Sequence, residues 1–300
     1  MAVGRVLLVA GILTLLFIPY LLWGTGLSTS NRQAELRKQF GSEQHGSGLS
    51  PANLVSAPKV GAPGGPPQVA PVIADPAVGS PVGVIAIPKI GLSMVMVEGI
   101  DEAQLRMGPA HYPGTPLPGE AGNAAIAGHR TTYLHPFYSV DALVPGDNIV
   151  VTTLQGIFLY KVSSSEVVAP SDVAVVGPTS TPQLTLTTCN PRYSAAQRLI
   201  VHAVLAASSL VHPKSVLTST TPTAPQPGRH QPVPTAPAKN WTATIVWGAV
   251  VAALTTAVWM ATSRTRRWRR ALISSGGTLA WLVVVFYFFQ SVSPLFGGSF

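Results

Sequence analysis

Charged residues are scarce in this chain. They make up 10% of its 300 residues, whereas a soluble globular protein usually carries about 25%. The mean hydropathy is also positive, at +0.35. This composition does not fit a wholly soluble protein, and its simplest interpretation is that part of the chain lies in lipid.

Cysteine is nearly absent, since Cys189 is the only one in the chain. An intramolecular disulfide is therefore excluded. A single cysteine in an exported domain suggests either an intermolecular bond or a reactive thiol. The alternative is an inert thiol that packs as a small apolar side chain, and the count alone does not decide between these interpretations.

Three long stretches contain no charged residue at all: 6–31, 240–263 and 271–300. Each supplies the roughly 20 mainly apolar residues that a membrane-spanning helix needs. A buried core helix is the alternative for each stretch. A cleaved signal peptide is a further alternative for the first, but its apolar run exceeds the roughly 7–15 residues of a signal peptide. We therefore expect an uncleaved anchor.

The net charge of +8 would fit a nucleic-acid-binding protein, but its distribution does not. Five arginines lie within 264–270, whereas 82–210 holds six Lys or Arg against eight Asp or Glu. Short cytoplasmic loops of membrane proteins collect Lys and Arg. The sequence therefore predicts that 263–270 is cytoplasmic, that 28–240 is extracytoplasmic, and that nucleic acid is not a partner.

Two tracts have the composition of linkers. Residues 41–81 are rich in Gly, Pro, Ser and Ala, and 213–238 are rich in Pro and Thr. Such segments bury too little apolar surface to fold, so 41–81 is expected to be mobile and to lack regular structure, after a short polar helical stalk at 31–40. The domain between the two tracts shows many short strand-like runs with turn signals, which predicts an all-β barrel or sandwich.

The expected organisation follows from these segments. In chain order it comprises an N-terminal transmembrane anchor (1–27), an extracytoplasmic stalk and linker (28–81), a catalytic β domain (82–210), a second linker (211–240), a transmembrane helix (241–262), a basic cytoplasmic loop (263–270), a third transmembrane helix (271–290) and a short tail (291–300).

Three residues of the β domain could act together in acyl transfer. Cys189 ends a strand-like run and precedes a polar loop, Arg198 begins the next strand, and His129 follows a short apolar run and a glycine. If the two strands around the loop are neighbours, Cys189 and Arg198 lie side by side. A thiolate attacks an amide, a histidine moves the proton, and an arginine can stabilise the oxyanion.

Each of these residues has competitors. Arg198 could be a surface ion-pair residue, with Arg130 as the catalytic arginine in its place. His129 could be structural, and the other candidates for its role are His111, His135 and His202.

Three motifs together resemble those of the sortase family: "AIAGHR" (125–130), "LTLTTC" (184–189) and "QRLIVHA" (197–203). The resemblance covers about 82–206, and it implies a closed eight-stranded β-barrel with short helices. It also implies that Cys189 is the nucleophile, His129 the acid/base partner and Arg198 the oxyanion stabiliser. Tyr112, Thr188 and Tyr193 are expected to line the peptide groove.

The family resemblance also implies the reaction. A sortase cleaves a sorting signal of a surface protein between Thr and Gly through a thioester, and it transfers the protein to an amine of a cell-wall precursor. The stretches "HYPGTPLPGEAGN" (111–123) and "CNPRYSAAQR" (189–198) are most similar to class E, the housekeeping type of actinobacteria. Class E suggests an LAxTG signal in preference to LPxTG. Two C-terminal membrane helices would be unusual for that class.

Neither a metal nor another cofactor is expected, because acidic residues do not cluster near 167–183 as they do in calcium-binding relatives. Three alternatives stay open for the function. A class C pilin polymerase would carry a lid, for which Asp75-Pro76 is a candidate, although Ala77 follows where an aromatic residue is usual. The other two are a cysteine hydrolase and a non-enzymatic, membrane-tethered β domain.

Overall fold

The computed structural model describes residues 24–47, 67–210, 241–263 and 281–289, together with a few isolated positions within 11–20 and residue 292. The chain divides into two compact units. One contains 26–235, and the other combines the first 25 residues with 236–299. The expected linker 211–240 and the expected cytoplasmic loop 263–270 lie almost wholly outside the described residues.

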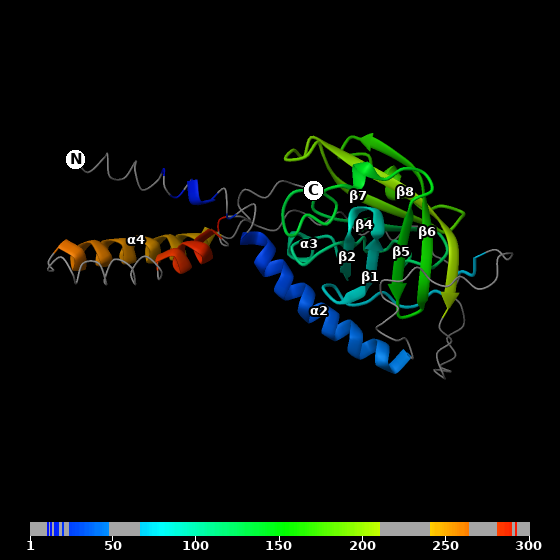
Figure 1. Cartoon of the computed structure of the whole chain (residues 1–300), viewed down its shortest axis with the longest axis horizontal. Helices are drawn as coiled ribbons and strands as arrows, with labels where there is room; N and C mark the ends of the chain where they lie inside the picture. Colours follow the sequence, from blue (N-terminus) through cyan, green and yellow to red (C-terminus); the bar gives the residue numbers. More distant parts are fainter. Residues whose placement is uncertain are drawn as a thin grey trace. The chain divides into compact units, whose positions relative to one another are not determined.

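The larger unit is built on a closed barrel of eight strands in the order β1-β2-β3-β4-β7-β8-β6-β5 (Figure 1). This confirms the expected fold and excludes the sandwich. The strands are β1 (Pro81–Ile87), β2 (Leu92–Glu98), β3 (Ala110–His111), β4 (Asn123–Ala127), β5 (Asn148–Thr153), β6 (Gly156–Val168), β7 (Gln183–Asn190) and β8 (Gln197–Leu210).

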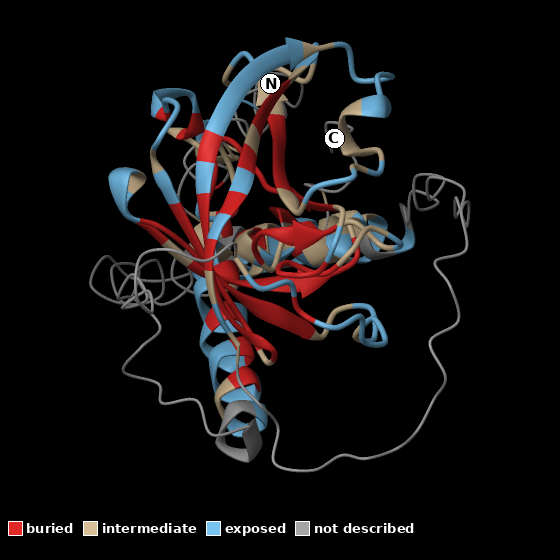
Figure 2. Ribbon diagram, turned by 90° about the vertical axis from the view of Figure 1, so that its right-hand side faces the viewer, coloured by how far each residue is buried: buried red, intermediate tan, exposed pale blue. Residues whose placement is uncertain are grey.

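Side chains along each strand alternate between the barrel interior, which forms the core, and the outer face. On β7, Leu184 and Leu186 belong to the main apolar cluster, whereas Thr185, Thr187 and Cys189 point to the opposite, outer face. Side chains of a strand alternate between the two faces of a sheet, so one strand both fills the barrel and presents polar groups outside it. Figure 2 shows the resulting concentration of buried residues along the barrel strands.

Short helical elements connect the strands. A single helical turn, α3 (Glu102–Leu105), follows β2. Single 3-10 turns lie at Pro88–Ile90, Val140–Ala142 and Ala174–Val176. Strand β3 was not foreseen, because two residues are too few to show a period. It is nevertheless essential for closure, since it pairs with both β2 and β4.

Helix α2 (Thr25–Ser47) is longer than the expected stalk and packs on the barrel. The Gln33 side chain donates to the carbonyl of Val95 at 2.9 Å and accepts from its amide at 2.8 Å. Leu36 and Phe40, three and seven residues further on, are buried beside it. Residues at this spacing share one helix face, and three such positions were too few to stand out in an otherwise polar sequence. Residues 41–47 are therefore helical, contrary to the expectation of an irregular linker.

Residues 67–80, also expected to be linker, form a strap on the barrel. Ala70 is buried in the core and donates its amide hydrogen to the carbonyl of Gly119 at 2.8 Å. The amide of Ile73 donates to Glu120 Oε1 at 3.0 Å, and burial is the main cause that raises the pKa of this carboxyl. The strap has no core of its own. Hydrogen bonds between its backbone and the barrel hold it in place instead.

The smaller unit contains helix α4 (Trp241–Ser263) and the helical segment 281–289. The Trp281 indole donates to Thr255 Oγ1 at 2.9 Å, and the rings of Trp247 and Tyr287 stack at 5.3 Å. No helix in the described ranges has both the length and the apolar character that a membrane crossing requires. The three membrane spans are therefore not confirmed and stay predictions.

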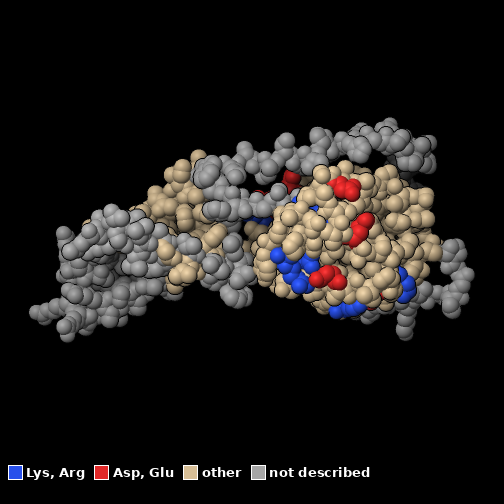
Figure 3. Space-filling view, turned by 90° about the horizontal axis from the view of Figure 1, so that it is seen from above, with Lys and Arg blue, Asp and Glu red and all other residues tan. Residues whose placement is uncertain are grey.

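Charge is mixed on the barrel surface. On the face that Figure 3 shows, Lys and Arg lie close to Asp and Glu without separating into fields of one sign. One ion pair of the barrel joins Lys89 and Asp147 at 2.7 Å. A nucleic-acid-binding surface would need a basic stripe, so this face offers no support for such a role.

Candidate functional site

Cys189 is the penultimate residue of β7, and its neighbour across the β7–β8 ladder is Arg198. The sequence prediction that these two residues lie side by side is thus confirmed. The loop between the strands, 191–196, is short, so both residues stand where the ladder ends. Cys189 is half-buried, and β7 holds its backbone.

His129 lies at the same edge of the barrel. Strands β4 and β7 are parallel, and the last register pair joins Ala127 with Thr187. His129 and Cys189 each follow two residues later, so both lie at this end of the parallel pair, with His129 just beyond β4 and Cys189 still paired with β8. Two hydrogen bonds extend the contact beyond the register, from the Gly128 amide to the Thr187 carbonyl at 3.1 Å and from Thr188 Oγ1 to the Gly128 carbonyl at 2.7 Å.

Glycine is required before the histidine. A Cβ atom at position 128 would lie 2.6 Å from the ring of Phe137, which is wholly buried. Such a contact forces either the ring or the strand to move. Gly128 therefore lets the chain pass close over Phe137 and fixes the position at which His129 begins.

The His129 ring lies in an apolar and electropositive pocket. Its Nδ1 is 3.1 Å from Thr132 Oγ1, and its ring centroid is 4.7 Å from that of Tyr133. Burial and the nearby Arg106 lower the pKa of His129 to about 3. The imidazole is therefore neutral at physiological pH, and its low pKa makes it a weak base in the resting state.

Burial also raises the pKa of the Cys189 thiol, whereas Arg198 and Arg130 oppose this effect. Because the imidazole pKa is lowered and the thiol pKa is raised, the resting pair is a neutral thiol beside a neutral imidazole. A proton must therefore leave the thiol when it reacts, and a neutral base is present at the same barrel edge to receive it.

This resting state makes a prediction for thiol alkylation. Since the folded pKa is raised, the rate of modification by iodoacetamide should rise with pH through a midpoint above the ordinary thiol value of about 8.5. Replacing Arg198 with glutamine removes an opposing charge and should shift the midpoint further upward. Mass spectrometry of the full chain between about pH 6 and 10 measures the rate without background, because no other thiol exists. A midpoint below the ordinary value would contradict this account.

Arg130 is poorly suited to replace Arg198 as the oxyanion stabiliser. It is 4% exposed, and its Nη1 donates to the carbonyl of Cys189 at 3.1 Å and to Asn190 Oδ1 at 3.0 Å. Its Nη2 pairs with Asp141 at 3.0 Å. These contacts hold the end of β7 in place, so the geometry makes Arg130 a positioning residue. Sequence reasoning did not find Asp141, which is 11 residues away from Arg130 with no motif to link them.

Arg198 is half-buried and lies on the outer face with Cys189. Its Nη1 donates to the carbonyls of Ala195 and Gln197, each at 3.2 Å. These bonds keep the guanidinium near the β7–β8 loop beside the thiol. A guanidinium in this position presents a fixed fork of donors to a developing oxyanion.

The three residues expected in the peptide groove have different environments. Tyr112 is half-buried, and its hydroxyl lies 3.1 Å from Oγ1 of Thr187, on the same face of β7 as Cys189. Tyr193 lies in the β7–β8 loop with 71% of its surface exposed. Thr188 is only 3% exposed and its hydroxyl bonds Gly128, so its geometry fits positioning of the site better than contact with a peptide.

The competing histidines are engaged elsewhere. His111 is wholly buried, with Nδ1 2.7 Å from Glu98 Oε2 and Nε2 3.0 Å from the Pro116 carbonyl. His135 is exposed in a turn and packs on Tyr138. His202 pairs with Glu166 at 3.1 Å, on a part of β8 that faces Thr185 rather than Cys189. Of these four histidines, His129 is the one that follows β4 at the edge where Cys189 lies near the end of β7.

No group of three or more His, Cys, Asp or Glu side chains suited to a metal ion occurs within the described part of the chain. The expectation of a metal-free site stays a prediction. The residues around Cys189 are a base, a cation and hydroxyl groups, and these types suffice for acyl transfer through a thioester.

Comparison with known proteins relates this domain to a known family. Residues 85–206 match the family described as the sortase domain. Over 216 residues the chain is 29% identical to sortase SrtE1 of Streptomyces coelicolor, and the match covers 67% of this chain and 55% of that relative. The chain therefore spans little more than half the length of this curated relative.

Solved structures also match. The chain is 36% identical to a Clostridium perfringens sortase D5 transpeptidase, with a TM-score of 0.41 and coverage of 44% of this chain and 82% of that one. It is 33% identical to sortase E1 of Streptomyces coelicolor, solved with a tripeptide in the active site, with a TM-score of 0.42 and coverage of 44% and 91%. The match over residues 85–206 shows that the barrel is a sortase domain.

Proposed function

We propose that this protein is a cysteine transpeptidase that cleaves a sorting signal of the LAxTG or LPxTG type between Thr and Gly. The acyl group passes to Cys189 and then to an amine of a cell-wall precursor of the lipid II type. The observation that carries this proposal is the convergence of Cys189, Arg198 and His129 at one barrel edge.

The proposed reaction begins with attack of Cys189 Sγ on the Thr carbonyl carbon, while His129 takes the thiol proton. The negative charge that develops on the carbonyl oxygen is stabilised by the Arg198 guanidinium. When the intermediate collapses, the C–N bond breaks and His129 gives its proton to the Gly amine. An acceptor amine then attacks the thioester, His129 receives its proton, and the thiol is released with that proton restored.

The function is tested with the full chain in detergent and a fluorescent peptide that carries LAxTG or LPxTG. Mass spectrometry should detect a thioester on the protein, and an added amine should convert the peptide into an amide product. Hydrolysis alone, unchanged by the amine, would favour the cysteine hydrolase. Absence of any thioester under all conditions would overturn the proposal in favour of a non-enzymatic domain.

The pilin polymerase alternative would place Asp75 over the thiol. In the structure the amide of Ile73 bonds Glu120, and Asp75 acts on the same carboxylate. Glu120 precedes the start of β4, whereas His129 follows its end, about 16 Å away along the strand. The strap therefore lies away from the proposed catalytic edge and does not support a lid.

Arg198→Lys should lower kcat by about 10²–10³-fold. The variant should fold like the parent chain. Lysine keeps the positive charge but loses the planar fork of donors that fits an oxyanion. Peptide cleavage with circular dichroism measures the effect, and Arg32→Lys, at an exposed position of α2, is the matched control. Parent-like turnover by Arg198→Lys would contradict the oxyanion role of Arg198 and make Arg130 the next candidate.

The localisation is part of the same proposal. An extracytoplasmic barrel anchored in the membrane, with the arginine-rich segment 264–270 in the cytoplasm, is supported by the charge distribution of the sequence. Such a barrel would meet both surface proteins that bear sorting signals and a membrane-bound cell-wall precursor.

A further inference from the structure

Asp141 lies between two arginines that come from different sides of the candidate site. Its carboxylate accepts from Arg130 Nη2 at 3.0 Å and from Arg192 Nη2, at 2.8 and 2.9 Å to its two oxygens. Arg130 directly follows His129, and Arg192 lies three residues after Cys189. One side chain therefore joins the segment that carries the base to the loop that follows the nucleophile.

Each of these arginines is held at a second point. Arg130 Nη1 donates to the Cys189 carbonyl at 3.1 Å. Arg192 Nε donates to the Tyr138 carbonyl at 3.1 Å, and its guanidinium carbon lies 4.4 Å from the centroid of the Tyr138 ring. An aromatic ring attracts a cation placed over its face. The end of β7 and the start of the β7–β8 loop are therefore both tied to other segments of the barrel.

The carboxylate of Asp141 also balances the charge of the two arginines. Arg130 is 4% exposed, and burial lowers the pKa of its guanidinium. Asp141 opposes this effect, whereas the charge of Arg192 adds to it. Without Asp141, two groups of the same sign would repel each other, and the buried one would lose its carboxylate partner. A buried charge that loses its partner is strongly unfavourable.

The two ion pairs extend the influence of Asp141 to the nucleophile and to the peptide groove. Burial raises the pKa of the Cys189 thiol, and Arg130 is one of the two cations that oppose this effect. Tyr193, expected in the peptide groove and 71% exposed, directly follows Arg192. Loss of Asp141 would therefore disturb both the reacting thiol and the loop that presents Tyr193.

We propose that Asp141 is a positioning residue of the transpeptidase, which holds the Cys189 backbone through Arg130 and the β7–β8 loop through Arg192. The proposal rests on the proposed function. The acyl group on Cys189 must keep its place until the amine attacks, and a displacement of about 1 Å can lower a rate by about 10²-fold. A fixed end of β7 meets this requirement in both steps.

The test compares Asp141→Asn with Asp141→Glu in the full chain in detergent, with circular dichroism to measure folding. Asparagine keeps the shape of aspartate but loses the charge, so kcat for a sorting-signal peptide should fall by up to about 10²-fold. Glutamate keeps the charge, and a side chain that is 40% exposed has room for one more methylene group, so kcat should stay close to the parent value. A role in packing alone predicts the opposite order, because asparagine has the shape of aspartate and glutamate does not.

A second variant separates the two ion pairs. Arg192→Gln releases the β7–β8 loop and keeps the pair of Arg130 with Asp141. KM should therefore rise by about 5-fold, which is the range of an exposed ion pair, while kcat stays near the parent value. Combined with Asp141→Asn, it should add no further rise in KM, because both changes break the same contact. The Arg192 side chain is 37% exposed, so this variant should fold, and it decides the test even where Asp141→Asn does not.

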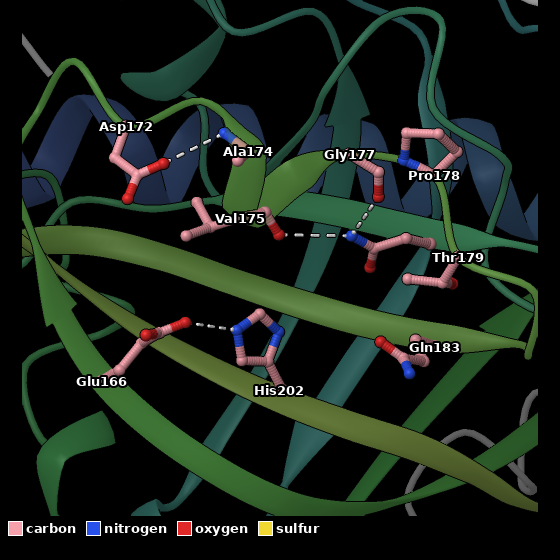
Figure 4. Close-up of a pocket in the computed structure, with 10 residues that line it drawn as sticks. Glu166, Asp172, Ala174, Val175, Gly177, Pro178, Thr179, Gln183 and His202 are labelled. Carbon is pink, nitrogen blue, oxygen red and sulfur yellow. Dashed lines mark hydrogen bonds and ion pairs between the residues drawn. The ribbon is translucent and has the colours of Figure 1, made fainter.

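Glu166→Gln is the matched control. Glu166 is a carboxylate with 52% of its side chain exposed, and its Oε1 lies 3.1 Å from His202 Nε2. Figure 4 shows this pair beside a hollow of about 370 Å³ that the 172–179 loop also lines. Because β8 separates its strand, β6, from β7, Glu166→Gln should keep the parent kcat and KM.

Three results would overturn the positioning role and leave the transpeptidase intact. They are parent-like kcat and KM in a folded Asp141→Asn chain, a lower kcat for Asp141→Glu than for Asp141→Asn, and a parent-like KM for Arg192→Gln. Failure of the parent chain to form a thioester with any peptide would instead overturn the proposed function itself.

Discussion

Cys189→Ala is expected to abolish acyl-enzyme formation. The variant has no thiol left, since Cys189 is the only cysteine in the chain, so a thioester cannot form on any residue. Loss of a catalytic nucleophile typically costs on the order of 10⁶ in kcat. Intact-mass spectrometry after incubation with peptide should show the unmodified chain alone, and peptide cleavage should fall to the uncatalysed level.

The control for this variant is a measurement of its peptide affinity and of its folding. Because alanine removes a single atom from a half-buried position, the barrel should keep its fold and its affinity for the peptide. Fluorescence anisotropy with the labelled peptide and a thermal melt measure both properties. Retained cleavage by a folded Cys189→Ala chain would contradict the whole assignment of covalent chemistry.

His129→Ala is expected to reduce kcat by about 10²–10⁴-fold, which is the usual contribution of a general acid or base. The variant lacks the base that takes the thiol proton and the acid that protonates the leaving amine. With its pKa lowered to about 3, the imidazole is neutral in the resting state, as the first of these steps requires. Single-turnover cleavage by rapid quench separates the loss in acylation from any loss in transfer.

His135→Asn is the control for His129→Ala. His135 is exposed and its backbone has a φ of 37°, which asparagine tolerates better than most residues. It should turn over peptide at nearly the parent rate. His111 is a poor control, because its removal would leave the Glu98 carboxyl buried without its partner. Parent-like kcat in a folded His129→Ala chain would remove His129 from the mechanism.

Local patterns predicted most of the strands. Runs such as 92–98 and 148–154 alternate or are β-branched, and the structure contains β2 and β5 there. The full length of helix α2 and the strap at 67–80 were not predicted, because distant partners and not local patterns stabilise them. Gln33 and Ala70 are held by partners on the barrel, about 60 and 50 residues away in the chain, and no local property of their own segments reveals these partners.

The candidate site shows the same division. Order and residue type singled out Cys189, His129 and Arg198, and the short loop between β7 and β8 already implied that the first and last are neighbours. The sequence could not show that β4 lies parallel to β7 in a register that carries His129 to the same edge, because parallel neighbours are joined by long connections.

By itself the sequence determined the chemistry available to this protein: one thiol, the histidines, the arginines and the alternation that turns Cys189 outward from β7. The tertiary structure decided which of these groups act together. In the folded chain, Arg130 pairs with Asp141 and donates to the Cys189 carbonyl, whereas Arg198 lies across the ladder from Cys189. Glu166, Asp172 and His202 line one hollow. These are contacts between distant segments, and only the closure of the barrel sets their distances and their burial, which in turn govern charge and proton transfer.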